Sequence, residues 1–425
     1  MLFSTQSGWY DPNPSPLNPS PHPENQAVFG SMRDYWWQTS REHLLVTGQV
    51  INEPRSDGTP RWILLDHDEA YYDGLSLDDP TILLEAQAKA RDSGWAVDGF
   101  DKYVVIYAQS SLIGSRNGGL FPHALGLNGE AYIIGERMPD VLHPPDVWFT
   151  HIGPHTHEFA HTIGFSDEYC PDNPDCGQTD PEFFDVMSKG LWNGKLSLGE
   201  CPAQADPYYR VQFEWVRPIP VDSDRHGMEV TYNYANPIFY RIEPFESQGR
   251  EVFLFETRLR EGFDLYTPDD PSNFQFQPGT LLIWRINLNI SPGFADRVQL
   301  VNASGTQFAM YWFFPSLPPE SQSFNDFSEP AKPLLGRDQL AHIALNGIHK
   351  NPTTHNAIID DILIPFGQGI VRENTIWSGP TNIEYPVRVL KGACLTIAAG
   401  SEITITSTPT VRLGSRRTRM RIRGL

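Results

Sequence analysis

The segment from His157 to Asp167 (HEFAHTIGFSD) places the strongest constraint on how this chain can fold. On an α-helix, residues four apart lie on one face, so His157 and His161 can direct their imidazoles at a single metal ion. Gly164 then predicts the end of the helix, because a sharp turn there needs a residue that tolerates positive φ. Beyond that turn, Asp167 can return an oxygen ligand to the same ion. The segment therefore predicts a helix, a turn and a metal site with three protein ligands.

Glu158 follows the first histidine directly, where a carboxylate can take a proton from a metal-bound water. Three protein ligands and one open position describe a catalytic zinc site, whereas structural zinc sites have four protein ligands. The alternative is that the HExxH pattern arose by chance and that the two histidines only line or cap a helix. The additional Gly164 and Asp167 at the extended spacing favour the zinc site.

Composition predicts a multi-domain protein with a substantial core. The chain has 425 residues, enough for two or three domains, and 40% of them are hydrophobic. Its 37 Pro and 34 Gly residues favour a loop-rich and β-rich architecture over a helical bundle. The net charge of -20 argues against a nucleic-acid partner. One basic cluster lies near the C-terminus and consists of Arg416, Arg417, Arg419, Arg421 and Arg423. We interpret this cluster as a solvated tail or an exposed strand face and not as a binding site.

The cysteines and the absence of long apolar runs bear on where the protein acts. No stretch approaches the roughly 18 apolar residues that span a bilayer, and the first residues lack the pattern of a secretory signal. Four cysteines are compatible with two disulfides, a local one between Cys170 and Cys176 and a second between Cys201 and Cys394, although sequence cannot fix the pairing. The cysteines favour a secreted or cell-surface protein although no signal pattern is visible. We also expect a monomer. The alternative is a cytoplasmic enzyme with free thiols.

The chain divides into four parts. Residues 1–27 are rich in Pro, Asn and Ser and predict an extended arm without a core. Residues 28–218 hold the metal motif and form the predicted catalytic domain. Within it, the pattern predicts helices over 31–40 and 82–90, and strands over 44–50, 103–107 and 131–134. The strand at 131–134 comes just before the metal-binding helix, and we expect it to form the edge of a substrate cleft.

The second half of the chain is predicted to be β-rich. Between 219 and 371, short apolar runs at 239–242, 252–256 and 281–286 alternate with turn residues, as expected for a β-sandwich. The last part, 372–425, contains short β-branched runs at 393–397 and 402–406 on either side of a small-residue corner. These runs predict either one or two coils of a β-solenoid or an extra hairpin. The expected fold class is α+β.

With these residues in view, the chain resembles the immune inhibitor A-type (M6 family) metallopeptidases, which are metzincin-like zinc proteases. The resemblance covers roughly residues 28–350 and is strongest at the zinc motif. Phe183–Ser188 (FFDVMS) is similar to the family's Met-turn, in which a Met lies beneath the metal. Other similar segments are 30–40 with 44–48, 97–107, 209–215, 251–256 and 279–284.

The resemblance implies a metzincin-like catalytic domain that uses Zn²⁺ to cleave proteins or peptides. His157 and His161 would bind the zinc, and Glu158 would act as general base. Asp167 would be the third ligand, with its neighbour Glu168 as the alternative. Met187 would form the hydrophobic floor of the site, a role compatible with an ordinary buried Met.

The chain also departs from the family. Arg285-Ile286-Asn287 stands where the family often has His-x-Asp. An acidic loop surrounds Cys170 and Cys176, and its carboxylates are those of Asp167, Glu168, Asp172, Asp175 and Asp180. These carboxylates could bind Ca²⁺, although a solvated loop closed by a disulfide is the preferred interpretation. For His151 and His155, just before the metal motif, packing or surface roles are preferred over a role in orienting the site.

These observations predict a zinc-dependent endopeptidase. The alternative is a non-catalytic, secreted adhesion or carbohydrate-binding protein with a vestigial metal site, which the β-rich second half would suit. An intact Glu158 argues against a vestigial site, because a decayed site has no need of its base. Zinc acting on a small-molecule amide or a glycan has no other support in the sequence.

Overall fold

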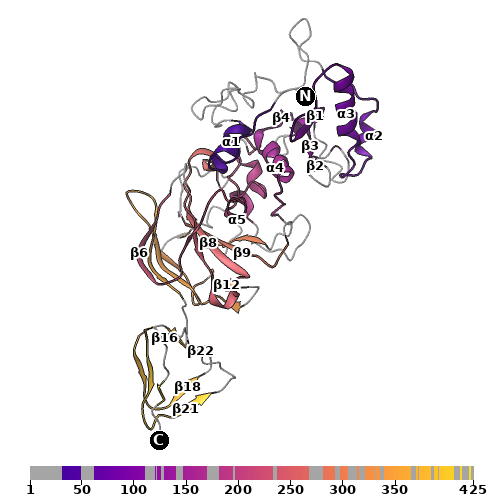
Figure 1. The fold of residues 1–425 in the computed structure, drawn as a ribbon. Helices are drawn as coiled ribbons and strands as arrows, with labels where there is room; N and C mark the ends of the chain where they lie inside the picture. The colour runs from indigo at the N-terminus through magenta and orange to yellow at the C-terminus, as the bar shows by residue number, and fades with distance from the viewer. Residues whose placement is uncertain are drawn as a thin grey trace.

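The fold is taken from a computed structural model of the chain. It describes residues 31–48, 62–110, 120, 122–125, 129–139, 147–169, 181–194, 197–232, 237–267, 281–291, 297–304, 314, 321–329, 331–335, 339–364, 370–371, 373–383, 387–390, 392–405, 412–413 and 421–422. These residues form a mixed α/β structure of the α+β class with several sheets and few helices (Figure 1). The predicted arm at 1–27, Cys170, Cys176 and the acidic residues Asp172, Asp175 and Asp180 lie outside the described residues.

The first helix, α1 (Met32–Thr39), confirms the prediction for 31–40. Ser31 caps it: the Asp34 amide donates to Ser31 Oγ at 3.3 Å, and the Ser31 amide donates to the Asp34 carboxylate at 3.0 Å. Trp36 is fully buried, with its ring 5.5 Å from that of Phe159 on the metal-binding helix. The helix therefore packs directly against the helix that carries the metal motif.

The strand predicted over 44–50 is wrong for the described part, 44–48, which pairs with no strand there. Its side chains do alternate: Leu44 and Val46 pack against the core, and Leu45 is exposed. An extended segment lying on a core gives the same period of two as a strand, so the pattern alone cannot reveal whether a partner strand is present.

The first sheet contains β1 (Tyr103–Ser110), β2 (His123–Leu125), β3 (Ala131–Pro139) and β4 (Val147–Phe149). Strand β3 lies inside this sheet, parallel to β1 on one side and antiparallel to β2 and β4. The strands predicted at 103–107 and 131–134 are therefore confirmed, but β3 is not an edge strand. Its backbone groups are already paired on both sides, and among the described residues β1 and β2 lie at the two ends of the strand order.

Helices cover both faces of this sheet, because the side chains of β3 point alternately to either face. Ala131 and Ile133 belong to a cluster with α2 (Glu69–Asp73) and α3 (Thr81–Asp92), and α3 confirms the helix predicted over 82–90. Tyr132 and Ile134 belong to the main core, with α4 (Ile152–Thr162) and α5 (Pro207–Gln212). Helix α4 is thus held between the first sheet and the rest of the molecule (Figure 1).

Two further sheets follow. One has the order β10-β9-β8-β7-β5, and the other the order β11-β14-β15-β6. The three strands predicted between 239 and 286 are confirmed as β7, β8 and β9. The bounds are β5 Ile219–Pro220, β6 Arg225–Val230, β7 Tyr240–Ile242, β8 Glu251–Thr257, β9 Leu281–Asn287, β10 Val298–Leu300, β11 Ser321–Phe324, β14 Ala344–Lys350 and β15 Ala357–Leu363, with a small hairpin of β12 Leu334–Leu335 and β13 Gln339–Leu340.

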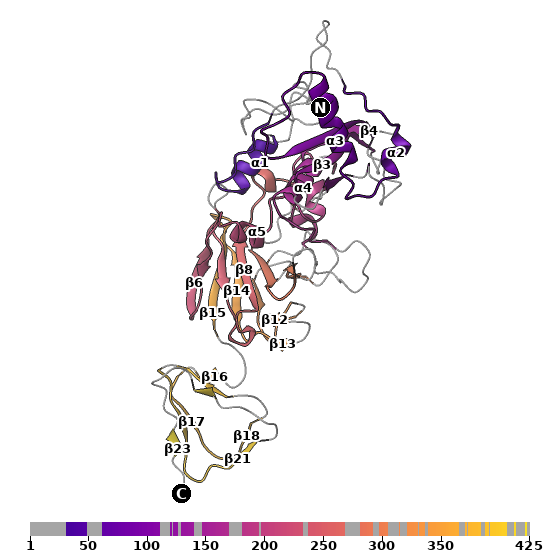
Figure 2. The ribbon, with the colours of Figure 1, turned by 45° about the vertical axis from the view of Figure 1, so that its right-hand side comes forward.

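Strand β8 is buried on both faces, and this makes its sheet the middle layer of the molecule. Phe253 and Phe255 face the β11-β14-β15-β6 sheet, with the Phe253 ring 5.7 Å from that of Phe324. Val252 and Leu254 point the other way, into the cluster that also contains Phe159 of α4. The main core therefore contains residues from both sides of the predicted boundary between residues 218 and 219. In Figure 2, α5 lies next to one end of β8.

The C-terminal strands stack as coils. Parallel pairing joins β16 to β19 and β22, β17 to β20 and β23, and β18 to β21, so the strand order repeats in threes. This is the arrangement of a β-solenoid, whereas a hairpin would need antiparallel neighbours. The strands are β16 Ile370–Val371, β17 Thr375–Trp377, β18 Thr381–Ile383, β19 Arg388–Val389, β20 Leu395–Ile397, β21 Ile403–Ile405, β22 Arg412–Leu413 and β23 Arg421–Ile422.

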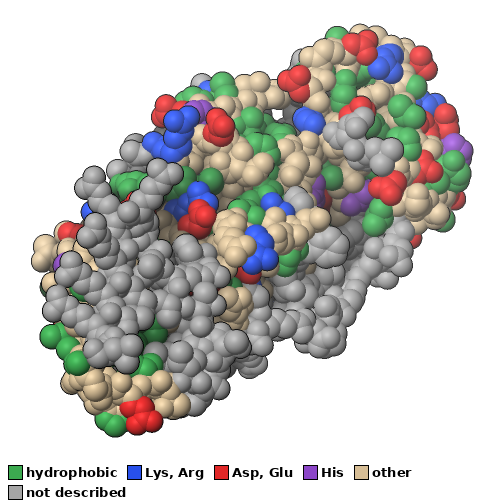
Figure 3. Space-filling view, turned by 60° about the horizontal axis from the view of Figure 1, so that its bottom comes forward, with side chains coloured by type: hydrophobic (Ala, Val, Ile, Leu, Met, Phe, Trp, Pro, Cys, Tyr) green, Lys and Arg blue, Asp and Glu red, His purple; other side chains and the backbone are tan. Residues whose placement is uncertain are grey.

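The predicted Cys201–Cys394 disulfide is wrong, because both residues are free thiols. Cys201 is buried in the main core, and Cys394 lies in the solenoid next to β20. None of the helices in the described ranges is long and apolar enough to cross a membrane. On the face drawn in Figure 3, Lys and Arg side chains occur in small groups beside acidic ones. Of the basic C-terminal cluster, the structure describes only Arg421, in the backbone of β23.

Lys102 offers a test of how α4 is fixed to the first sheet. Its ammonium donates to Thr162 O at the end of α4, at 2.6 Å, and to Gly129 O just before β3, at 2.7 Å. We predict that Lys102→Met lowers the free energy of unfolding by about 1–2 kcal/mol, because two carbonyl groups lose a charged donor. Urea unfolding would measure this. Lys89→Met, which removes only an exposed pair with Asp66, should change little, and an equal loss in both variants would contradict the prediction.

Candidate metal centre

Helix α4 carries both histidines of the motif and ends where Gly164 predicts. Gly164 has a φ of 102°, in the left-handed region that favours glycine. The Phe165 amide donates to Ala160 O and the Gly164 amide to His161 O, both at 3.0 Å, which together form a Schellman turn. The Phe165 ring then stacks on Tyr209 of α5, with centroids 4.2 Å apart. This turn sends the following residues back along the face of α4 that carries the histidines.

Three potential ligand atoms meet on that face. His157 Nε2 and His161 Nε2 lie 3.2 Å apart. Asp167 Oδ1 lies 3.2 Å from His157 Nε2 and 3.3 Å from His161 Nε2. Within the described ranges, this is the one group of three or more His, Cys, Asp or Glu side chains whose ligand atoms come this close together. The structure thus brings together three residues that could hold a metal ion.

The opposite nitrogen of each imidazole faces a backbone carbonyl. His157 Nδ1 lies 2.9 Å from Val186 O, and His161 Nδ1 lies 3.0 Å from Phe165 O. Because a carbonyl oxygen can only accept a hydrogen bond, Nδ1 carries the hydrogen in both rings. In a neutral ring the lone pair is then on Nε2, directed at the other ligand atoms. Metal-binding histidines are commonly oriented in this way.

Asp167 and its neighbour Glu168 have different surroundings. The Asp167 side chain is 40% exposed and reaches both histidines, whereas Glu168 is fully buried. The Glu168 amide donates to Met187 O at 2.9 Å, so the chain pairs with the Met187 segment at this point. Burial, together with the charges of Asp206 and Asp185, raises the pKa of Glu168 to about 10. Asp167 is therefore the carboxylate that joins the group.

Close approach of the side chains alters the protonation of Asp167 and His161. Burial opposes ionisation of Asp167, but the hydrogen bonds and charges of the two histidines outweigh it and lower its pKa well below the usual value. Burial likewise opposes a charged His161, yet the Asp167 hydrogen bond and the Glu158 charge raise its pKa to about 9. Without metal, one proton thus stays on the His161–Asp167 pair at neutral pH.

Glu158 is buried beside the group, and its burial raises its pKa in spite of the nearby imidazoles. His157 and His161 are not the only histidines that act on it, because His123 on β2 also interacts with it electrostatically. Sequence reasoning missed His123, which belongs to no motif. The only sequence signal for His123 is that it lies in a short segment just before β3. This segment forms β2, and its pairing with β3 brings His123 next to α4.

The remaining predicted site residues lie as follows. Met187 is fully buried in the main core, next to the Val186 carbonyl that faces His157. His151 and His155 are buried, which rules out surface roles. His155 Nδ1 lies 3.1 Å from the Tyr132 hydroxyl, and burial lowers its pKa to about 3, in keeping with the predicted packing role. Arg285 pairs with Glu251 at 2.6 Å across β8 and β9.

No protein-family model matches this chain, and no curated protein matches it significantly.

The protonation of His161 predicts that metal binding depends on pH. Because its pKa of about 9 applies to the metal-free protein, a metal ion must displace a proton at any lower pH. Apparent zinc affinity should therefore fall by about tenfold for each pH unit between about pH 8 and pH 6. Competition with a chromophoric chelator at several pH values would measure it. A zinc affinity that is constant over this range would contradict the prediction.

A pair of substitutions distinguishes the two candidate third ligands. Asp167→Ala removes the oxygen that lies near both histidines, and should weaken zinc binding by more than about 100-fold, beyond the effect of losing an outer hydrogen-bonding partner. Glu168→Gln keeps the shape of a buried side chain outside the group and should leave zinc affinity unchanged. Zinc content after dialysis, together with chelator competition, would show which carboxylate matters. The reverse result would make Glu168 the ligand.

Proposed function

We propose that this chain is a zinc-dependent endopeptidase with a metzincin-like catalytic region, of the immune inhibitor A (M6) type. The observation that carries the proposal is the close approach of His157 Nε2, His161 Nε2 and Asp167 Oδ1, all within 3.2–3.3 Å of one another, with Glu158 buried beside them. The Met187 segment adds support, because Val186 O faces His157 Nδ1 and the segment resembles the family's Met-turn.

The residue types and their spacing both fit zinc. Two imidazole nitrogens suit zinc and other transition metals, whereas Ca²⁺ and Mg²⁺ prefer oxygen ligands throughout. In a tetrahedral zinc site with ligands at about 2.0–2.1 Å, neighbouring ligand atoms lie about 3.3 Å apart. The three separations found here agree with that value. Three ligands leave a fourth position for water or substrate, as catalytic zinc sites require.

Glu158 is the residue proposed to move protons. A zinc ion held by this group would lower the pKa of its bound water to about 7 and polarise a substrate carbonyl. The Glu158 carboxylate would accept a proton as water attacks the carbonyl and would deliver it to the leaving amine. Burial of Glu158 suits this role, because a raised pKa makes the carboxylate a stronger base.

Strand β2 is the part of the first sheet best placed to bind a substrate. It is one of the two end strands of this sheet among the described residues, and its His123 interacts with Glu158. An extended peptide could add to such a strand through main-chain hydrogen bonds and place its carbonyl near the metal group. This arrangement favours a peptide over a small molecule or a glycan as the substrate.

Glu158→Gln tests the proposal directly. The amide keeps the size of the side chain but cannot accept a proton, so we expect kcat/KM for a casein substrate to fall by about 100- to 10,000-fold. Zinc content should stay at that of the unchanged protein. The matched control is Glu182→Gln, which removes a carboxylate paired with Lys189 at 2.5 Å and should keep full activity.

A chelator separates the enzyme from the alternative of a binding protein with a vestigial site. The unchanged protein should cleave casein, lose that activity with a zinc chelator, and regain it when zinc is added. Cleavage that resists the chelator, or no cleavage of casein or gelatin by the zinc-loaded protein, would overturn the proposed function. Full activity of Glu158→Gln would overturn the assignment of the base alone.

A further inference from the structure

The segment from Phe184 to Met187 links the metal group to the middle sheet. On one side, Val186 O faces His157 Nδ1 at 2.9 Å and Met187 O accepts the Glu168 amide at 2.9 Å. On the other side, Phe184 O accepts a hydrogen bond at 2.6 Å from Nη1 of Arg258, which follows β8 directly. A backbone segment held at both ends transmits the position of one contact to the other.

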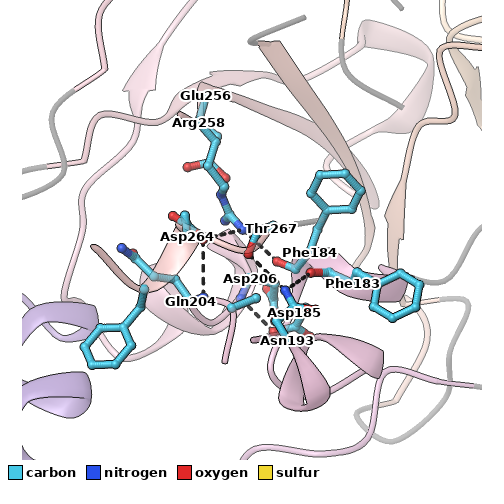
Figure 4. A network of polar contacts seen from close by, with 12 residues as sticks. Phe183, Phe184, Asp185, Asn193, Gln204, Asp206, Glu256, Arg258, Asp264 and Thr267 are labelled. Atoms are coloured by element: carbon cyan, nitrogen blue, oxygen red, sulfur yellow. Dashed lines mark hydrogen bonds and ion pairs between the residues drawn. The ribbon is translucent and has the colours of Figure 1, made fainter. Parts of the chain in front are cut away.

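Arg258 is itself held in a single buried arrangement (Figure 4). Its side chain is 2% exposed. Nη2 donates to Glu256 Oε1 at 2.8 Å, and Nη1 lies 3.5 Å from Asp264 Oδ1. Glu256 also accepts a hydrogen bond from the Trp284 indole at 3.2 Å, which fixes the carboxylate to β9. The planar guanidinium fork thus joins a rigid pair of strands to the carbonyl of Phe184.

The segment and the residue before it, Phe183, have further contacts that leave them little freedom. The Asp206 amide at the start of α5 donates to Asp185 Oδ1 at 3.0 Å. Asn193 Nδ2 donates to Phe183 O at 2.8 Å and to Thr267 Oγ1 at 3.0 Å. Figure 4 shows these residues converging on the same short stretch of chain. Of the donors described here, only Arg258 directly follows a strand of the middle sheet and donates to a carbonyl of the segment that carries Val186.

We propose that Arg258 is a positioning residue for the metal centre, which holds Phe184 O so that Val186 O, two residues on, keeps the His157 ring directed at the metal. The proposal rests on the proposed function only in requiring that the chain binds zinc. The middle sheet then contributes to metal affinity although none of its side chains belongs to the ligand group. A ring free to rotate would have to be reoriented at each binding event, which would weaken zinc binding.

The test compares the full chain with Arg258→Lys, Arg258→Met and Arg285→Met. Arg258→Lys keeps the buried positive charge beside Glu256 and Asp264 but loses the planar fork that also reaches Phe184 O. Arg285→Met is the matched control, because it removes a comparable ion pair, with Glu251, from the neighbouring strand β9. Zinc affinity would be measured by chelator competition, and ligand geometry by the absorption spectrum of the Co²⁺-loaded protein. Thermal unfolding would establish that each variant is folded.

We expect Arg258→Lys and Arg258→Met to weaken zinc binding by about tenfold or more, the lower range for losing an outer partner of a metal-binding histidine. Their Co²⁺ spectra should change as well, and Arg285→Met should match the unchanged chain in both measurements.

Arg258→Lys is decisive because it keeps the buried charge. If it binds zinc as tightly as the unchanged chain, the proposal is overturned, even if Arg258→Met fails to fold. An equal loss in Arg285→Met would also overturn it, by showing a general loosening of the sheet. A full chain that binds no zinc would instead refute the proposed function.

Discussion

The closeness of two imidazole nitrogens and one carboxylate oxygen, 3.2–3.3 Å from one another, is the constraint that the surrounding structure serves. Holding such groups together costs free energy unless a proton or a cation lies between them. The fold meets this cost with backbone groups: Val186 O and Phe165 O fix the rings, and the turn at Gly164 returns the carboxylate. Most of this holding is done by main-chain atoms, whose positions depend on the contacts of the surrounding fold.

The middle sheet connects this centre to the rest of the molecule. Along β8, alternate residues face two different cores: Val252 and Leu254 pack toward α4, and Phe253 and Phe255 pack toward the opposite sheet. Because both faces are buried, a shift of a strand in this sheet alters the packing of the cores on both sides. The two regions predicted on either side of residue 218 therefore share one core, although their sequences have different periodicities.

Local patterns in the sequence predicted the local structure well. The spacing of His157, His161, Gly164 and Asp167 was enough to foresee a helix, a turn and a converging group, because all these contacts lie within one turn-containing segment. Contacts between distant residues could not be foreseen. Phe184 O and Arg258 are 74 residues apart, and no periodic pattern marks either of them. Strand order is equally invisible locally, so the interior position of β3 and the free thiol of Cys201 required the structure.

The stacked coils after residue 369 differ from the rest of the fold because the number of coils can change without repacking a shared core. Each coil pairs only with its neighbours, as β19 does with β16 and β22, so the stability of the stack is close to a sum over coils. Adding or deleting one coil would move everything beyond it by about 4.8 Å, the spacing of paired strands. The packed cores around α4 and β8 would not be disturbed. The number of coils can therefore change without altering the contacts that form the metal centre.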